Sequence, residues 1–315
     1  MTSIARSGTP DDMAPTRLAR VGAFVERAIT AVPPSLGIAL AAVAWSMIVA
    51  FSAPGHPWST FQEARCYWLP TLEDPYRLST WTSQVAYVYS PAFLQLMAPI
   101  SWLPWPLFVG IWAAILIGVV RWLTGPRWLW LAMIAAAMEL SGGNISLLLA
   151  LAVVLGFRWP ATWAFILLTK ITPGIGLLWF AVRREWRQLG LALAATAIVV
   201  VVSAAVLPGA WRDWIDVLMT NADAGRTGTW AALPIPLWAR LPAAAALVVW
   251  GARTDRRWTV LVASMIALPA LWYGGFSMLI ALFAIRREEQ RESGWDEPEG
   301  QRPMHGTPLQ GVAAG

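Results

Sequence analysis

The chain is poor in the side chains on which redox and metal chemistry usually depend. Its 315 residues include one cysteine and two histidines, and the histidines lie far apart at positions 56 and 305. One cysteine allows neither an internal disulfide nor a cysteine-based zinc or iron–sulfur site, and two distant histidines argue against a histidine-built metal centre. We therefore expect no metal and no cofactor.

Charge is also scarce. Only 13% of the residues are charged and 57% are apolar, whereas about a quarter of a typical globular domain is charged. This composition excludes disordered and collagen-like chains and is typical of a membrane protein. Lys170 is the only lysine, so arginine supplies almost all of the formal net charge of +5. In a membrane chain such arginines are first read as topology signals, and we expect no nucleic-acid partner.

Apolar runs separated by proline, glycine and arginine predict an all-α, polytopic integral membrane protein with about ten transmembrane helices. The runs lie at 36–53, 90–103, 105–123, 128–140, 145–157, 161–182, 189–207, 233–250, 258–270 and 272–285. The expected domain organisation is a tail at 1–33, a transmembrane domain at 34–287 with loops at 54–89 and 208–232, and a disordered tail at 288–315.

Arginine clusters at 183–187, 253–257 and 286–291 fall on one side of such a ten-span arrangement, together with the N-terminal tail. Because positively charged loops stay in the cytoplasm, we expect a plasma-membrane protein with both termini cytoplasmic and the two long loops outside. In this scheme three further arginines lie on the outer side: Arg121, Arg127 and Arg158. We find no two matching halves, which argues against an inverted-repeat transporter.

Polar residues that could carry chemistry occur in the first loop and within two apolar runs. Glu63 and Arg65 lie among aromatic residues, which suits either a sugar site or an ordinary solvated loop. Glu139 and Lys170 lie inside apolar runs, where charged side chains are functional candidates. A lipid phosphate is an attractive partner for Lys170, and a pair with Glu139 or snorkelling to the interface is the alternative.

Three groups of motifs resemble glycosyltransferase family 87, whose members are integral membrane enzymes of the GT-C superfamily. Glu63 and Tyr67 stand where that family has Asp-x-x-x-Tyr after its first span, so glutamate replaces aspartate here. The second and third groups follow in the family's order: Asp74-Pro75-Tyr76 with Tyr87-Val88-Tyr89-Ser90-Pro91, and Gly143-Asn144 with Lys170-Ile171-Thr172-Pro173 and the basic turn at 183–187.

The resemblance implies a GT-C-like fold and the transfer of a sugar, with mannose the first candidate, from a polyprenyl-phosphate donor. The acceptor is a hydroxyl of a lipid or glycan on the outer face, membrane lipid surrounds the protein, and the reaction inverts the anomeric centre. Glu63 is the expected catalytic base. The expected donor phosphate-binding residues are Lys170, Arg65 and Arg226, and the expected substrate-binding residues are Tyr67, Asp74, Tyr76, Tyr87, Tyr89 and Asn144.

Two other functions compete with this interpretation. A transporter or flippase-like protein would use Glu139 and Lys170 as a gated intramembrane pair. A non-catalytic membrane subunit would keep the fold and bind a partner. An enzyme of this kind should instead show a cavity that opens to the outer side and to the outer leaflet of the membrane and reaches Glu63.

Overall fold

The computed structural model describes residues 61–77, 87–223 and 235–292, and every regular element in these ranges is helical. The tail at 1–33 and the first predicted span at 36–53 lie outside the described residues. The elements are α3 (Gln62–Trp68), α4 (Pro91–Ser101), α5 (Trp105–Thr124), α6 (Leu129–Ala135), α7 (Ala137–Gly142), α8 (Ser146–Gly156), η2 (Pro160–Thr162), α9 (Trp163–Thr169), η3 (Thr172–Leu177), α10 (Leu178–Val182), α11 (Trp186–Val206), α12 (Pro208–Asp223), α13 (Leu237–Thr254), α14 (Trp258–Ile266), η4 (Tyr273–Ala281) and α15 (Leu282–Glu292).

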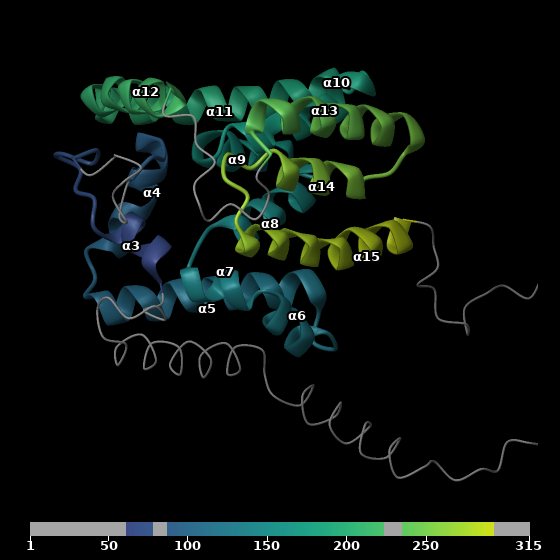
Figure 1. The fold of residues 1–315 in the computed structure, drawn as a ribbon. Helices are drawn as coiled ribbons and strands as arrows, with labels where there is room; N and C mark the ends of the chain where they lie inside the picture. The colour runs from purple at the N-terminus through teal and green to yellow at the C-terminus, as the bar shows by residue number, and fades with distance from the viewer. Residues whose placement is uncertain (1–60, 78–86, 224–234, 293–315) are drawn as a thin grey trace, which may run out of the picture.

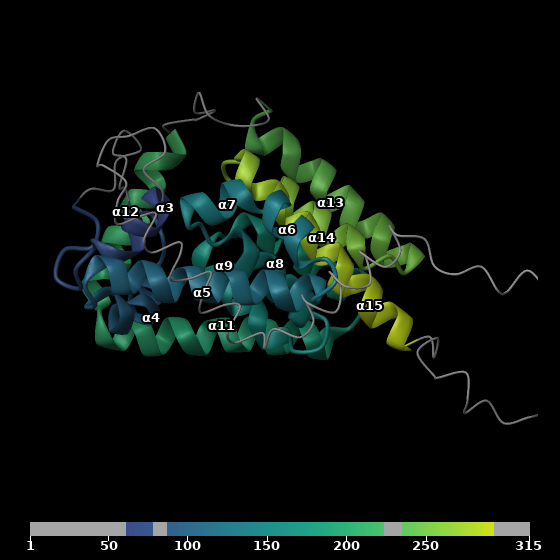
Figure 2. The same ribbon diagram turned by 90° about the horizontal axis from the view of Figure 1, so that it is seen from below.

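Two helices of the described part, α5 and α11, are long and apolar enough to cross a membrane. They lie on opposite sides of the bundle in Figure 1, and their axes are roughly parallel in both views (Figures 1 and 2). One side of α5 is buried, whereas α11 buries only Ala192 and Ser203 and exposes a surface of Leu, Ile and Val. An exposed apolar surface of this extent suits contact with lipid chains.

Five of the predicted spans fold into three hairpins that share one end of the bundle. In the run at 161–182, which we expected to cross once, the ring of Trp163 packs on Phe180 and Phe157 packs on Trp179. The beginning and end of the run therefore lie together, and η2–α9 and η3–α10 form a hairpin that turns at Lys170. Its prolines and glycines prevent a continuous helix.

The other two hairpins are α6–α7 with α8, which turns at Gly143 and Asn144, and α14 with η4–α15. In the latter, Arg257 Nη1 lies 2.9 Å from Glu292 Oε1, which joins the beginning of α14 to the end of α15. Helix α15 thus continues to Glu292, beyond the predicted boundary at 287. The ten-span arrangement is not reproduced by the described residues, because the run at 161–182, expected to cross once, begins and ends at the same end of the bundle.

We call this common end the arginine end. Arg287 Nη2 donates to the carbonyl of Trp122 in the last turn of α5 and interacts electrostatically with Arg121. Arg158 likewise interacts electrostatically with Glu288 of α15. Arg121 and Arg158 therefore lie beside the predicted cytoplasmic arginines, and placing them on the outer side was wrong. The physical reason is that the intervening helices turn back instead of crossing.

The opposite end of the bundle is formed by α3, α4 and α12 (Figure 1). Helix α4 lies across this end between α11 and α5, so the run at 90–103 does not follow the direction of the two long helices. The expected loop at 208–232 contains α12, whose Trp214 Nε1 donates to the carbonyl of Val88 at 3.1 Å. This segment therefore forms an amphipathic helix, which buries the indole of Trp214 on one side, and not a solvated loop.

Candidate active site

The tips of the three hairpins meet inside the bundle. Thr172 Oγ1 donates to the carbonyl of Ala267 at 2.5 Å, which joins the second tip to the third. A Cβ on Gly274, near the third tip, would lie only 2.6 Å from Glu139 Oε2 of α7. The polar residues of three separated segments are thereby held together away from both ends of the long helices.

Helix α3 is docked against the first of these tips. The amide of Phe61 donates to the carbonyl of Ser141 at 2.6 Å, and the indole of Trp112 donates to the carbonyl of Gly143 at 2.7 Å. Gly143 has φ +68°, and a Cβ there would lie 2.7 Å from Phe61 Cδ1 and 2.9 Å from Ala64 Cβ. Only glycine combines this conformation with so close an approach of α3.

This docking places Glu63 at the hairpin tips. Its side chain is half-buried, and its Cγ lies 3.5 Å from the position that a Cβ on Gly142 would occupy. Among the described residues, its carboxylate makes no hydrogen bond or ion pair, and it interacts electrostatically with Lys170. Burial raises the pKa of Glu63 above its usual value, and the positive charge of Lys170 partly opposes that rise.

Lys170 supplies the positive charge of the site. Lys170 follows the last residue of α9, and its backbone is extended, with φ −135° and ψ 100°. The end of α9 is held by the hydroxyl of Ser90, which donates to the carbonyl of Leu168. The ammonium interacts electrostatically with Glu139 and Glu63. Within the described part of the chain it forms no ion pair at 4.0 Å or less, so it has capacity to bind an anion.

Glu139 is the second carboxylate near Lys170, and the predicted set of site residues did not include it. Its side chain is only 2% exposed, and Oε1 accepts a 2.6 Å hydrogen bond from the amide of Ser146 in the first turn of α8. A helix N-terminus favours a negative charge at this position. The sequence signal was available, since an acidic residue inside an apolar run is unusual.

Tyr67, Tyr89 and Asn144 form a buried polar cluster next to Glu63. The hydroxyl of Tyr67 donates to Asn144 Oδ1 at 3.2 Å and lies 3.3 Å from the hydroxyl of Tyr89. The amide of Ile145 also donates to Asn144 Oδ1, at 2.7 Å. Burial raises the pKa of Tyr67 well above its usual value, so its hydroxyl stays protonated as a donor.

The remaining predicted site residues lie at different distances from this centre. Tyr76 and Tyr87 continue the aromatic row from Tyr89, and their hydroxyls donate to the carbonyls of Tyr89 and Ser90. Arg65 instead lies over the ring of Trp105, 5.2 Å from its centroid, because positions two apart on a helix point in different directions. Asp74 is exposed, and Arg226 is outside the described residues.

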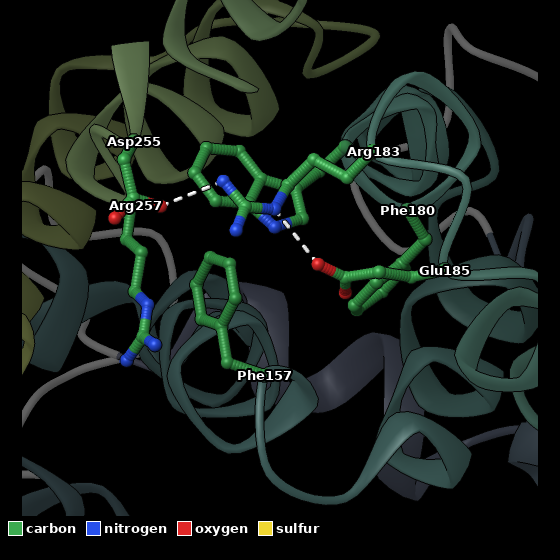
Figure 3. A pocket seen from close by; sticks show the side chains of 7 residues that line it. Phe157, Phe180, Arg183, Glu185, Asp255 and Arg257 are labelled. Atoms are coloured by element: carbon green, nitrogen blue, oxygen red, sulfur yellow. Dashed lines mark hydrogen bonds and ion pairs between the residues drawn. The ribbon is translucent and has the colours of Figure 1, made fainter. Parts of the chain in front are cut away.

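A second polar cluster lies at the arginine end, around a cavity of about 60 Å³ (Figure 3). There Arg183 bridges Glu185 and Asp255, each at 2.7 Å. Sites for small organic ligands usually enclose about 300–1,000 Å³. The cavity is thus too small for a sugar, and the charge of Arg183 is already balanced. Within the described ranges, no three potential metal ligands lie together.

The chain matches a known protein family. The model of glycosyltransferase family 87 matches residues 87–294, a stretch that contains Tyr87, Tyr89, Asn144 and Lys170 and begins after Glu63. No curated protein and no solved structure matches the chain. The family match spans more than half of the sequence, and its members are membrane proteins, in agreement with the apolar helices. The chain therefore belongs to glycosyltransferase family 87.

Proposed function

We propose that this protein transfers a sugar, with mannose the first candidate, from a polyprenyl-phosphate donor to an acceptor hydroxyl on the extracytoplasmic face. The observation that carries the proposal is the juxtaposition of Glu63 and Lys170. Among the described residues the carboxylate of Glu63 has no hydrogen-bond partner, and it interacts electrostatically with Lys170, the only lysine of the chain, where three hairpin tips and α3 meet. Transfer from a phosphate-linked donor by general-base catalysis needs a carboxylate that accepts the proton of the acceptor and a cation that stabilises the leaving phosphate.

The two side chains have complementary roles in this reaction. The acceptor oxygen attacks the anomeric carbon, while its proton passes to the carboxylate of Glu63. The bond between the anomeric carbon and the phosphate oxygen breaks, and the leaving phosphate keeps the electron pair. The ammonium of Lys170 stabilises the negative charge that develops on that phosphate. Attack from the face opposite the phosphate inverts the anomeric configuration.

The tyrosine–asparagine cluster positions the base and lines the acceptor side. Tyr67 lies one helical turn after Glu63, and its ring packs edge-on against Tyr89 at 5.3 Å and against Phe93 at 5.4 Å. The hydrogen bond from Tyr67 to Asn144 joins α3 to the first hairpin tip. Aromatic faces and fixed hydroxyls of this kind suit a sugar ring. Lipid or glycan acceptors fit equally, because both present hydroxyls.

A turnover assay with purified protein tests the proposal. Incubation with a panel of polyprenyl-phosphate sugars and lipid acceptors should consume one donor and release polyprenyl phosphate. Because general-base help accelerates reactions by about 10²–10⁴-fold, Glu63→Gln should reduce kcat by that factor without loss of folded protein. Glu73→Gln, which changes an exposed acid of the same loop, is the matched control and should leave kcat unchanged. Full activity of Glu63→Gln would refute the assignment of the base.

A further inference from the structure

The site contains two carboxylates near one ammonium, and their surroundings differ. Glu139 is almost fully buried, its Oε1 is held by the amide of Ser146, and its Oε2 lies against Gly274. Glu63 is half-buried and has no hydrogen-bond partner among the described residues. One acid is therefore fixed in position, whereas the other is available to react.

Lys170 interacts with both acids but forms a close ion pair with neither. An ammonium that had only Glu63 as its counter-charge would pair with it directly. Such a pair would occupy the carboxylate and lower its affinity for a proton. Glu139 supplies a second negative charge that interacts with the same ammonium, and this competition opposes the pairing and keeps Glu63 open.

We propose that Glu139 is a positioning residue, whose fixed carboxylate holds the ammonium of Lys170 away from Glu63 and thereby keeps Glu63 free to accept a proton. This inference rests on the proposed function. It adds a role for the first hairpin tip, because the hydrogen bond from Ser146 at the start of α8 sets the place of the carboxylate. The three residues come from three segments and have different roles: Glu63 accepts the proton, Lys170 binds the phosphate, and Glu139 keeps the other two apart.

Infrared titration of Glu63 tests the inference without requiring turnover. The carboxylic-acid stretching band of Glu63 is assigned by its disappearance in Glu63→Gln, and its intensity is followed against pH. The charged groups that face Glu63 in the described structure are Lys170 and Glu139, with Cys66, Tyr67 and Tyr89 as titratable neighbours. All five of these groups are present in the wild-type protein, which is the reference for the titration.

Glu139→Gln should shift the titration of Glu63 to lower pH, with about a tenfold loss of proton affinity, because Lys170 then pairs with Glu63. The same substitution should lower kcat. In a Lys170→Met background, Glu139→Gln should shift the titration much less, because only the direct repulsion between the two carboxylates remains. Glu139→Asp keeps the charge and should retain most of the wild-type titration.

An unchanged Glu63 titration in Glu139→Gln would overturn the inference, and so would an equally large shift in the Lys170→Met background. If Glu139→Gln does not fold, Lys170→Met with and without Glu139→Gln decides the question, because both charges of the buried pair are then absent. A tenfold difference in the proton affinity of Glu63 between these two variants would overturn the inference. The expected infrared shift in a protein without transferase activity would support the charge arrangement and refute the proposed function.

Discussion

The proton affinity of Glu63 is set by groups from several parts of the chain. Burial raises its pKa above the ordinary value of 4.5, and Lys170 lowers it again in part. The nearby Tyr67, Tyr89 and Cys66 stay protonated near neutral pH because burial raises each pKa, that of Cys66 to about 12. Compared with these neighbours, Glu63 is therefore the residue suited to gain and lose a proton during turnover.

This arrangement predicts the pH dependence of turnover. A general base is active when deprotonated, so activity should fall as pH decreases through the raised pKa of Glu63, at a pH above 4.5. Lys170→Met removes the charge that lowers this pKa, so the acidic limb of the kcat profile should move to higher pH. The same variant should raise the KM for the lipid-phosphate donor.

Rate profiles of the wild type and Lys170→Met, measured with the donor at saturation, check this prediction. Arg65→Met provides a control, because that arginine stacks on Trp105 and should not affect the limb. If the acidic limb of the kcat profile lies at the same pH in Lys170→Met as in the wild type, the lysine does not interact with the base. An unchanged donor KM would remove Lys170 from the phosphate site.

At the scale of elements, the position of α3 depends on one of two adjacent glycines. Gly143 adopts φ +68° and touches Phe61 and Ala64 of the α3 region, whereas a Cβ on Gly142 would make ordinary contact with Glu63. A left-handed conformation costs a non-glycine residue about 1–2 kcal/mol, and a forced contact in a packed core about 1–3 kcal/mol. The two glycines therefore form a matched pair for mutation.

Gly143→Ala should destabilise the docked α3 and lower activity, whereas Gly142→Ala should leave both nearly unchanged. Cys66 is the only cysteine and lies buried in α3, so its rate of reaction with a maleimide reports on the docking. Labelling should be slow in the wild type and Gly142→Ala and faster in Gly143→Ala. Equal labelling rates in all three proteins would contradict this account of α3.

At the scale of the whole molecule, the hairpins place Arg158 and Arg253 at the same end. A ten-span arrangement separates these residues across the membrane, so the two descriptions make opposite predictions. Buried Cys66 is a poor topology probe, and cysteines are better introduced into a Cys66→Ser protein at exposed positions. Thr71 and Arg253 mark the two ends, and Arg158 decides between the arrangements.

Membrane-impermeant maleimide should label Thr71→Cys in intact cells, because α3 lies at the end opposite the arginines. Arg253→Cys and Arg158→Cys should react only after permeabilisation, as expected for arginine-rich segments that remain in the cytoplasm. Labelling of Arg158→Cys in intact cells would support the alternating spans instead. Labelling of Arg253→Cys in intact cells would reverse the orientation of the whole bundle.

The sequence by itself determined the helical class, the family and the main chemical groups. Apolar runs and punctuation by proline and glycine are local signals, so the break at Gly142–Asn144 could be predicted without coordinates, whereas the break after Lys170 lies inside a run that was expected to cross once. The scarcity of charge also marked Glu139 and Lys170 as unusual. These inferences need only the composition and order of neighbouring residues.

Only the tertiary structure decided which helices cross the bundle and which turn back. Hydropathy measures whether a segment can lie in lipid, but it does not show whether its two ends lie on the same side, and this is why Arg121 and Arg158 were misplaced. The meeting of Glu63 with Lys170 and Glu139 likewise joins positions far apart in the chain. Such contacts depend on how the hairpins pack, because long-range charge placement is a property of the assembled fold.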